Sequence, residues 1–345
     1  MTQGKDQGQP ARRVRPKRMP SMADVAAVAG VSHQTVSRVI NNKGSVKEAT
    51  RQRVMAAMSD LGYRRNESAR ALASSQSRQI GVITPRFVEW GPATILLSLQ
   101  LAANRADYFV SVATLSEFTS EAMREALDDL LSLGVAGIIA IAPVVPMARE
   151  LEAQTIPVPT LAVASAWIEG DSRLTRVGVD QRVGTRQALE HVKAEGCRSV
   201  AHIAGPPYDF DAMERNDAWR EYTQELGLRL GPRAEGDWTA GSGYNAMIEL
   251  LKEPLPDAIF VANDQMSLGA LKALEEAGVK VPEDVLLFGF DDQDGGAYFS
   301  PSLTTVHQDF EKVGADSIEA LTAMITGETP HVEAIPTRLV VRQSA

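Results

Sequence analysis

The chain has 345 residues, enough for two or three domains that each have a hydrophobic core, and its single cysteine, Cys197, excludes an internal disulfide framework. The formal net charge is −9, but residues 1–78 hold 15 Lys and Arg against 5 Asp and Glu, a charge of +10, which leaves −19 for the remainder. This asymmetry predicts different partners for the two parts, with nucleic acid or an anionic membrane surface as candidates for the basic part.

The first segment, residues 1–19, is rich in Gln, Gly, Pro and Arg and is predicted to be a disordered basic arm. It is not followed by the uninterrupted apolar stretch of a signal peptide, and no apolar run approaches the roughly 20 residues that span a bilayer. A single cysteine is also typical of a reducing compartment. We therefore expect a cytoplasmic protein without membrane attachment.

Residues 20–65 have the pattern of three short helices. Ser21 and Asp24 have the spacing of a capping box before the first helix, and Ser45 and Glu48 have the same spacing before the third. Only a few residues separate the first helix from the second. Three short helices with such a tight turn predict a helix-turn-helix domain.

The second of these helices has polar and basic residues on its predicted outer face, opposite Val and Ile residues at helical spacing. The outward residues are His33, Gln34, Ser37, Arg38 and Asn41. A helix fits the major groove of DNA, where Gln pairs with adenine and Arg with guanine. An ordinary solvated helix face is the alternative.

Residues 66–77 are polar, small and basic, and are predicted to be a hinge or linker. Residues 78–345 alternate short apolar runs such as QIGVI, AGIIAIA and AIFVAND with helical patterns, which predicts parallel sheets covered on both faces. Ligands of such sheets bind at the carboxyl ends of the strands. We expect two doubly wound lobes, roughly residues 78–177 plus 309–336 and residues 178–308 plus 337–345.

Six motifs together resemble those of the lactose-repressor-type (LacI/GalR) family of transcription regulators: MADVAAVAGVSHQTVSRVINNKGSV, NESARALASSQSRQIGVIT, EGDW, VANDQMSLGAL, GFDD and PSLTTVHQDF. The similarity covers residues 21–342 in order. It implies a helix-turn-helix head on an α/β, periplasmic-binding-protein-like body. It also implies a transcription repressor that binds a pseudo-palindromic DNA operator as a homodimer and is released by a small sugar or sugar-derived inducer.

The resemblance assigns base reading to His33, Gln34 and Arg38. Small polar side chains suited to phosphate oxygens are Ser21, Ser32, Thr35, Asn41 and Thr50. In the family, the hinge becomes a helix on the operator and inserts a leucine into the minor groove. Leu72 occupies that position, and Ala69 is assigned to the same groove. A leucine that packs the linker onto the body is the alternative.

The body matches the family's sugar-pocket positions at Arg215, Trp238, Asn263, Asp291, Gln308 and Phe310. The polar members supply the donors and acceptors that hydroxyl groups need, and Trp238 offers a flat apolar face to a sugar ring. Asn263 and Asp291 also follow apolar runs, where this fold binds ligands. Loop capping or core packing is the alternative for any one of them.

Four positions depart from the family's pocket pattern. Ile141 and Ala164 stand where the pattern has an Asn and an Asp, Asp211 replaces a small hydroxyl residue, and Glu89 replaces part of an apolar wall. Glu89 and Asp211 are therefore candidate effector-binding residues. Because unmatched polar contacts alter ligand preference, the relatives' sugar is not expected to carry over.

No Ser/His/Asp order, zinc-ligand spacing or P-loop occurs in the sequence. The close pair Asp209 and Asp211 is expected in a solvated loop. We therefore expect no enzyme activity, no metal and no cofactor. A regulator whose ligand promotes DNA binding stays open as an alternative, and a sugar-binding transport protein is a more distant one because it would need a signal peptide and no helix-turn-helix.

We expect a homodimer and not a tetramer. The final predicted strand lies within RLVVRQSA, which ends the chain a few residues beyond that strand and leaves no room for the apolar heptad helix of a tetramerising bundle. Two heads related by a two-fold axis would read matching half-sites about one helical turn apart.

Overall fold

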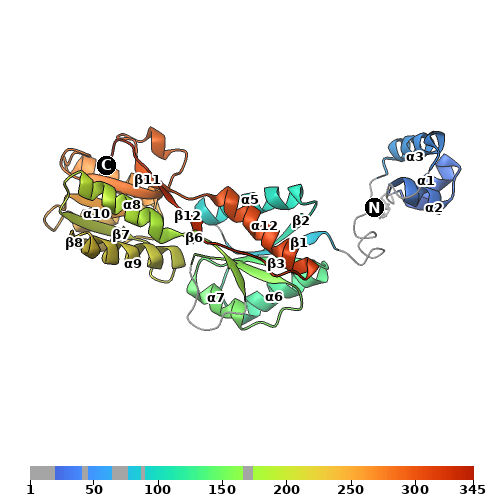
Figure 1. Ribbon diagram of the computed structural model, residues 1–345, viewed down its shortest axis with the longest axis horizontal. Coiled ribbons are helices and arrows are strands. Elements are labelled where there is room, and N and C mark those ends of the chain that lie inside the picture. Colours follow the sequence, from blue (N-terminus) through green and yellow to red (C-terminus); the bar gives the residue numbers. More distant parts are fainter. Residues whose placement is uncertain (1–19, 41–45, 64–76, 87–89, 166–173) are drawn as a thin grey trace, which may run out of the picture. The chain divides into compact units, whose positions relative to one another are not determined.

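The computed structural model describes residues 20–40, 46–63, 77–86, 90–165 and 174–345. The chain divides into two compact units, up to residue 75 and from residue 76 onward (Figure 1). The predicted basic arm and most of the predicted hinge lie outside the described residues. In the described part of the chain, no helix combines the length and the apolar character that crossing a membrane would require.

The head contains three helices, α1 (Met22–Ala29), α2 (His33–Ile40) and α3 (Glu48–Leu61). The predicted capping box before α1 is present, because the Ser21 side chain accepts from the Asp24 backbone and the Asp24 side chain accepts from the Ser21 backbone. The helices bury a small apolar core, made by Val25, Ala26, Ala29, Val36, Val39, Val54 and Ala57.

The prediction of a capping box before α3 is wrong. Lys47 is the N-cap of α3 and makes no side-chain capping bond, so Glu48 is the first residue of the helix. A capping box needs the acidic residue at the third helical position, and that position belongs to Thr50. The helix ends at Leu61, and its C-cap Gly62 has a φ of +60°, the left-handed conformation that glycine adopts easily.

The first lobe of the body has a parallel sheet in the order β2-β1-β3-β4-β5 (Figure 1). Its strands are β1 (Gln79–Pro85), β2 (Phe109–Leu115), β3 (Gly137–Ile141), β4 (Thr160–Val163) and β5 (Thr175–Val177). One face is covered by α5 (Trp90–Arg105) and α12 (Phe310–Thr326), and the other by α6 (Ser120–Ser132) and α7 (Val145–Glu152). The central strands β1, β3 and β4 are buried on both faces, which explains their continuous apolar runs, whereas the edge strand β2 is partly exposed.

The second lobe has a sheet in the order β13-β11-β10-β9-β7-β8, in which only β13 is antiparallel to its neighbour. Its strands are β7 (Ser199–Ala204), β8 (Arg229–Glu235), β9 (Ala258–Val261), β10 (Leu286–Asp291), β11 (Thr304–His307) and β13 (Arg338–Val340). One face is covered by α8 (Gln181–Ala194) and α9 (Phe210–Glu225), and the other by α10 (Ala240–Leu250) and α11 (Asp264–Glu276). A short 3-10 helix, Gly296–Tyr298, follows β10. The predicted fold class, an all-α head on a body of two doubly wound lobes, is confirmed.

The chain passes between the lobes after β5, after β11 and after α12. Two of these crossovers pair as short parallel strands, β6 (Val179–Asp180) and β12 (Ile335–Pro336). The hydroxyl of Thr337 strengthens this pairing, since it donates to the Asp180 carbonyl at 2.8 Å.

The lobes also meet through their loops. Val144, after β3, and Asp209, after β7, form an isolated antiparallel bridge. In this bridge the Phe210 N–H donates to the Pro143 carbonyl at 2.8 Å, and the Val145 N–H donates to the Tyr208 carbonyl at 2.9 Å. We call this pairing the interlobe bridge.

Candidate functional site

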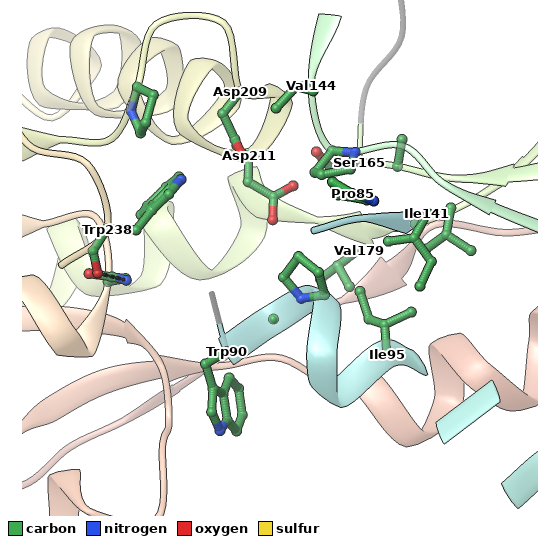
Figure 2. Close-up of a pocket in the computed structure, with 18 of the residues that line it drawn as sticks. Pro85, Trp90, Ile95, Ile141, Val144, Ser165, Val179, Asp209, Asp211 and Trp238 are labelled. Carbon is green, nitrogen blue, oxygen red and sulfur yellow. Dashed lines mark hydrogen bonds between the residues drawn. The ribbon is translucent and has the colours of Figure 1, made fainter. Parts of the chain in front are cut away.

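A cavity of about 280 Å³ lies between the two lobes (Figure 2). The second lobe lines it with residues that follow the carboxyl ends of strands, among them Asp209, Asn263 and Gln308. The first lobe contributes Trp90 and Ile141. This is the position where ligands of open α/β sheets bind.

Arg215, on α9, is buried at 2% exposure, and each nitrogen of its guanidinium has a polar partner. Its Nη1 donates to the Ala262 carbonyl at 2.6 Å, and its Nε donates to Gln181 Oε1 at 3.0 Å. Its Nη2 lies 3.3 Å from Asp211 Oδ2 and 3.6 Å from Asp291 Oδ1. Two carboxylates therefore offset the charge of a guanidinium that folding removes from water.

Asp291 ends β10 with a φ of +111°, which is rare for a residue with a side chain. Gln308 Nε2 donates to Asp291 Oδ1 at 2.7 Å, and Gln308 Oε1 accepts from Gln181 Nε2 at 2.9 Å. With Arg215 these residues form a closed ring of polar contacts. Burial raises the pKa of Asp291 to about 6, and the nearby charge of Arg215 opposes that rise.

Asn263 combines a capping role with a place in the cavity lining. Its Oδ1 accepts from the Met266 N–H at 2.8 Å and so caps α11. Its Nδ2 donates to the Trp238 carbonyl at 3.1 Å and helps to hold Trp238 at a φ of +73°. The Trp238 ring lies over Gly205, where a Cβ would come within 2.4 Å of it, so this approach requires glycine.

Aromatic side chains line the cavity on both lobes. Trp238 belongs to the second lobe, whereas Trp90 and Phe310 begin α5 and α12 of the first lobe. The rings of Trp90 and Phe310 meet edge to face, with centroids 5.4 Å apart. A ligand in the cavity can therefore contact an aromatic surface on either lobe.

Three of the four departing positions also line the cavity. Ile141 and Ala164 are buried on the first lobe, and Asp211 lies in the first turn of α9 with its side chain 34% exposed. Figure 2 shows the Asp211 carboxylate directed into the cavity, between Trp238 on one side and Ile141 on the other. Glu89 lies outside the described residues.

The expectation that Asp209 lies in a solvated loop is wrong. Asp209 is the N-cap of α9, is 7% exposed and lines the cavity, and its Oδ1 accepts from the Ala212 N–H at 3.1 Å. Burial, together with the charge of Asp211, raises its pKa to about 7. Its place after the apolar run SVAHIAG was the sequence signal for a cavity residue, because β7 ends there.

In the head, His33, Gln34 and Arg38 are exposed on α2, on the side opposite the buried Val36 and Val39. Several expected phosphate-binding hydroxyls take part in capping. Ser32 Oγ accepts from the Thr35 N–H at 3.1 Å and lies 2.9 Å from Thr35 Oγ1. Ser21 Oγ donates to Asp24 at 2.6 Å, and Thr50 is half-buried on α3. Asn41, Ala69 and Leu72 lie outside the described residues.

These features define a class of protein, one that joins a small helix-turn-helix head to a two-lobed body with a cavity for a small molecule. Residues 21–66 match the family described as bacterial regulatory proteins, lacI family, and residues 189–345 match the periplasmic binding protein-like domain. The chain belongs to the lacI family and is a DNA-binding transcriptional repressor.

Individual relatives support this assignment over nearly the whole chain. The lactose operon repressor of Escherichia coli K12 is 34% identical over 327 residues, which cover 94% of this chain and 90% of the relative. The ribose operon repressor of the same organism is 30% identical, with 90% and 94% covered. A crystal structure of the lac repressor dimer bound to operator and the anti-inducer ONPF superposes with a TM-score of 0.87 at 34% identity, covering 95% of this chain and 99% of that one.

Proposed function

We propose that this protein is a homodimeric repressor of a pseudo-palindromic operator, and that a small sugar or sugar-derived inducer releases it by binding in the cavity between the lobes. We further propose that it acts in the cytoplasm, where chromosomal DNA lies. The opposite sign of control, in which the ligand promotes DNA binding, would use the same cavity and is the alternative.

The polar ring of Arg215, Gln181, Gln308 and Asp291 carries this proposal. Its members bond to one another at the edge of the second lobe, while Trp90 and Phe310 face the same cavity from the first lobe. A polyol has hydroxyl groups for such a ring and an apolar carbon face for an aromatic surface. A ligand that contacts both lobes stabilises one arrangement of the lobes over others. This change in the body would then alter the DNA affinity of the head.

The names of two relatives also support a sugar, because they are repressors of lactose and ribose operons. The preferred sugar of this chain should differ from theirs. Ile141 and Ala164 provide no polar side-chain atoms, whereas Asp209 and Asp211 provide carboxylates.

For the DNA contact, we propose that the exposed His33, Gln34 and Arg38 read base edges, and that the small polar residues around them contact phosphates. We also propose that residues 66–77 form the hinge, with Leu72 and Ala69 in the minor groove. We propose the same domain limits as those expected from the sequence: a basic arm over residues 1–19, a head over 20–65 and a body over 78–345.

The proposal is tested with the full chain. An operator is first selected from random-sequence DNA, and sugars that raise the melting temperature of the protein are then added to the protein–operator complex. Stabilising sugars should release the operator. Arg215→Ala and Asp291→Asn should retain operator binding and lose release, because these side chains lie in the body's cavity and not in the head.

Arg220→Ala is the matched control, since Arg220 is exposed on the same helix and does not line the cavity. It should respond to sugar like the parent protein. Operator binding that tightens with the sugar would favour the co-repressor alternative. Operator binding that ignores every stabilising sugar would refute control by ligand.

A further inference from the structure

The cavity between the lobes has an excess of carboxylates. Four aspartates line it, Asp209, Asp211, Asp237 and Asp291, against two arginines, Arg86 and Arg215. Hydrogen bonds from Thr239 and Ser242 lower the pKa of Asp237, which keeps that exposed carboxylate ionised. Arg86, which follows the end of the first lobe's β1, is exposed as well, so water and salt screen the charges of Arg86 and Asp237 alike. The excess therefore lies in Asp209, Asp211 and Asp291 against Arg215.

Arg215 does not balance this charge alone. Its Nη2 is shared between Asp211 and Asp291, at 3.3 and 3.6 Å, and its other donors go to the Ala262 carbonyl and to Gln181. The guanidinium also lies over the Phe290 ring at 3.9 Å. Asp209 is almost fully buried, and its carboxylate accepts from the Ala212 backbone N–H. A cation brought by the ligand would offset the remaining carboxylate charge.

The geometry around Asp211 suits a cation from the ligand. Its carboxylate is directed into the cavity, and Asp209 lies two residues earlier at the start of the same helix (Figure 2). The same cavity has the indole rings of Trp90 and Trp238, and aromatic faces attract ammonium groups. Ser165 Oγ, also in the lining, is buried and has no hydrogen-bond partner in the described structure, so it can accept from a ligand N–H.

Two other occupants fit less well. Among the described residues, no group of three or more His, Cys, Asp or Glu side chains is arranged to hold a metal ion. A neutral sugar can donate hydroxyl hydrogens to Asp211, but it brings no positive charge to offset carboxylates that folding has partly removed from water.

We propose that the effector is an amino-substituted sugar or polyol, whose protonated amine is held by the Asp211 and Asp209 carboxylates while its hydroxyl groups meet the ring of Arg215, Asp291 and Gln308. This inference rests on the proposed function, because it names the chemical class of ligand for the same cavity. It also accounts for the position of Asp211, where the family pattern has a small hydroxyl residue.

The test compares matched sugars by calorimetric titration of the full chain. The pairs are D-glucosamine with D-glucose, D-galactosamine with D-galactose, and D-mannosamine with D-mannose, and the N-acetyl form of each amine is the uncharged control of similar shape. At least one amine should bind about tenfold or more tightly than both its neutral partners, because only the amine forms a partly buried ion pair.

Two variants test which carboxylates produce the preference for the amine. Asp211→Asn removes the charge at nearly constant shape and should weaken binding of the amine by about tenfold more than it weakens binding of the neutral sugars. Asp209→Asn should act in the same direction, and asparagine retains the N-cap acceptor that α9 needs. Asp217→Asn, an exposed carboxylate on α9 outside the cavity lining, is the matched control and should change neither affinity.

A panel in which no amine binds more tightly than its neutral partners would overturn the inference, and so would an amine preference that survives Asp211→Asn. If a neutral sugar binds best and releases the operator, the proposed function stands and the inference fails. If an amine binds through Asp211 but leaves operator affinity unchanged, the chemical class inferred for the cavity's ligand stands and the proposed function fails.

Discussion

At the scale of single residues, the head separates side chains that support the helix from side chains that face away from it. Val36 and Val39 are buried in the core of the head, whereas Gln34 and Arg38 of the same helix are exposed. Substituting an exposed residue of α2 therefore leaves the core of the head intact. Changes in DNA affinity at these positions can then be attributed to lost contacts with the DNA.

We expect Gln34→Ala or Arg38→Ala to weaken operator binding by about 1–3 kcal/mol and binding to random DNA by much less, because a bidentate base contact is lost only on the matching sequence. Fluorescence anisotropy on both DNAs at one salt concentration measures the difference. Gln52→Ala, an exposed change on α3, is the control. Equal losses of affinity for operator and random DNA would contradict the proposed role of Gln34 and Arg38 in reading bases.

The cavity residues show how far the sequence can predict a site. Asn263 and Asp291 were expected at the edge of the second sheet, because each follows an apolar run that becomes a strand. The prediction that Asp209 is solvated was wrong, because an aspartate at the start of a helix is usually exposed to water but this one is buried. Its burial depends on the interlobe bridge, in which Pro143 to Val145 of the first lobe pair with the residues around it. The sequence gives no local sign of that tertiary contact.

At the scale of elements, α10 and α11 cross at two glycines. A Cβ on Gly269 would lie 1.8 Å from the Ala240 carbonyl oxygen, and one on Gly243 would lie 2.2 Å from the Met266 carbonyl oxygen. Glycine inside a helix costs about 1 kcal/mol relative to alanine, and here it permits the two backbones to touch. Apolar periodicity predicts that both helices exist, but it does not predict this close crossing.

We expect Gly269→Ala to destabilise the body by about 1–3 kcal/mol, because the added methyl forces the two helices apart. Gly241→Ala is the matched control on α10, since its Cβ would lie 4.0 Å from Thr239 Oγ1, which is an ordinary contact distance. It should be neutral or raise stability by up to about 1 kcal/mol. Denaturant unfolding of both variants measures the difference, and equal midpoints would contradict the close crossing.

At the scale of the whole molecule, exposed apolar side chains gather on neighbouring elements of the first lobe. Leu97 and Leu101 of α5 and Phe109 and Val112 of β2 are each about half exposed, and α5 packs against β2. Such a surface is typical of protein contacts. We propose that it contributes to the dimer, a state in which the lac repressor has been solved on its operator.

We expect the full chain and residues 78–345 alone to sediment as dimers at micromolar concentration, because the proposed contact lies in the body. Leu97→Asp with Leu101→Asp should shift both towards monomer by placing carboxylates in an apolar contact. Leu133→Asp, equally exposed at the end of α6, should not. A tetrameric parent protein would refute the expected assembly, and a dimer that survives the double substitution would refute this surface.

The interlobe bridge also has a kinetic consequence. Residues of the bridge, Pro143 and Asp209 among them, line the cavity together with crossover residues such as Val179. We infer that a ligand enters when the two backbone hydrogen bonds of the bridge break and Phe210 loses its apolar contacts. Entry is then gated by this opening and not by diffusion alone, so the speed of the transcriptional response would be set in part by a pair of loops, one of which also carries Asp209.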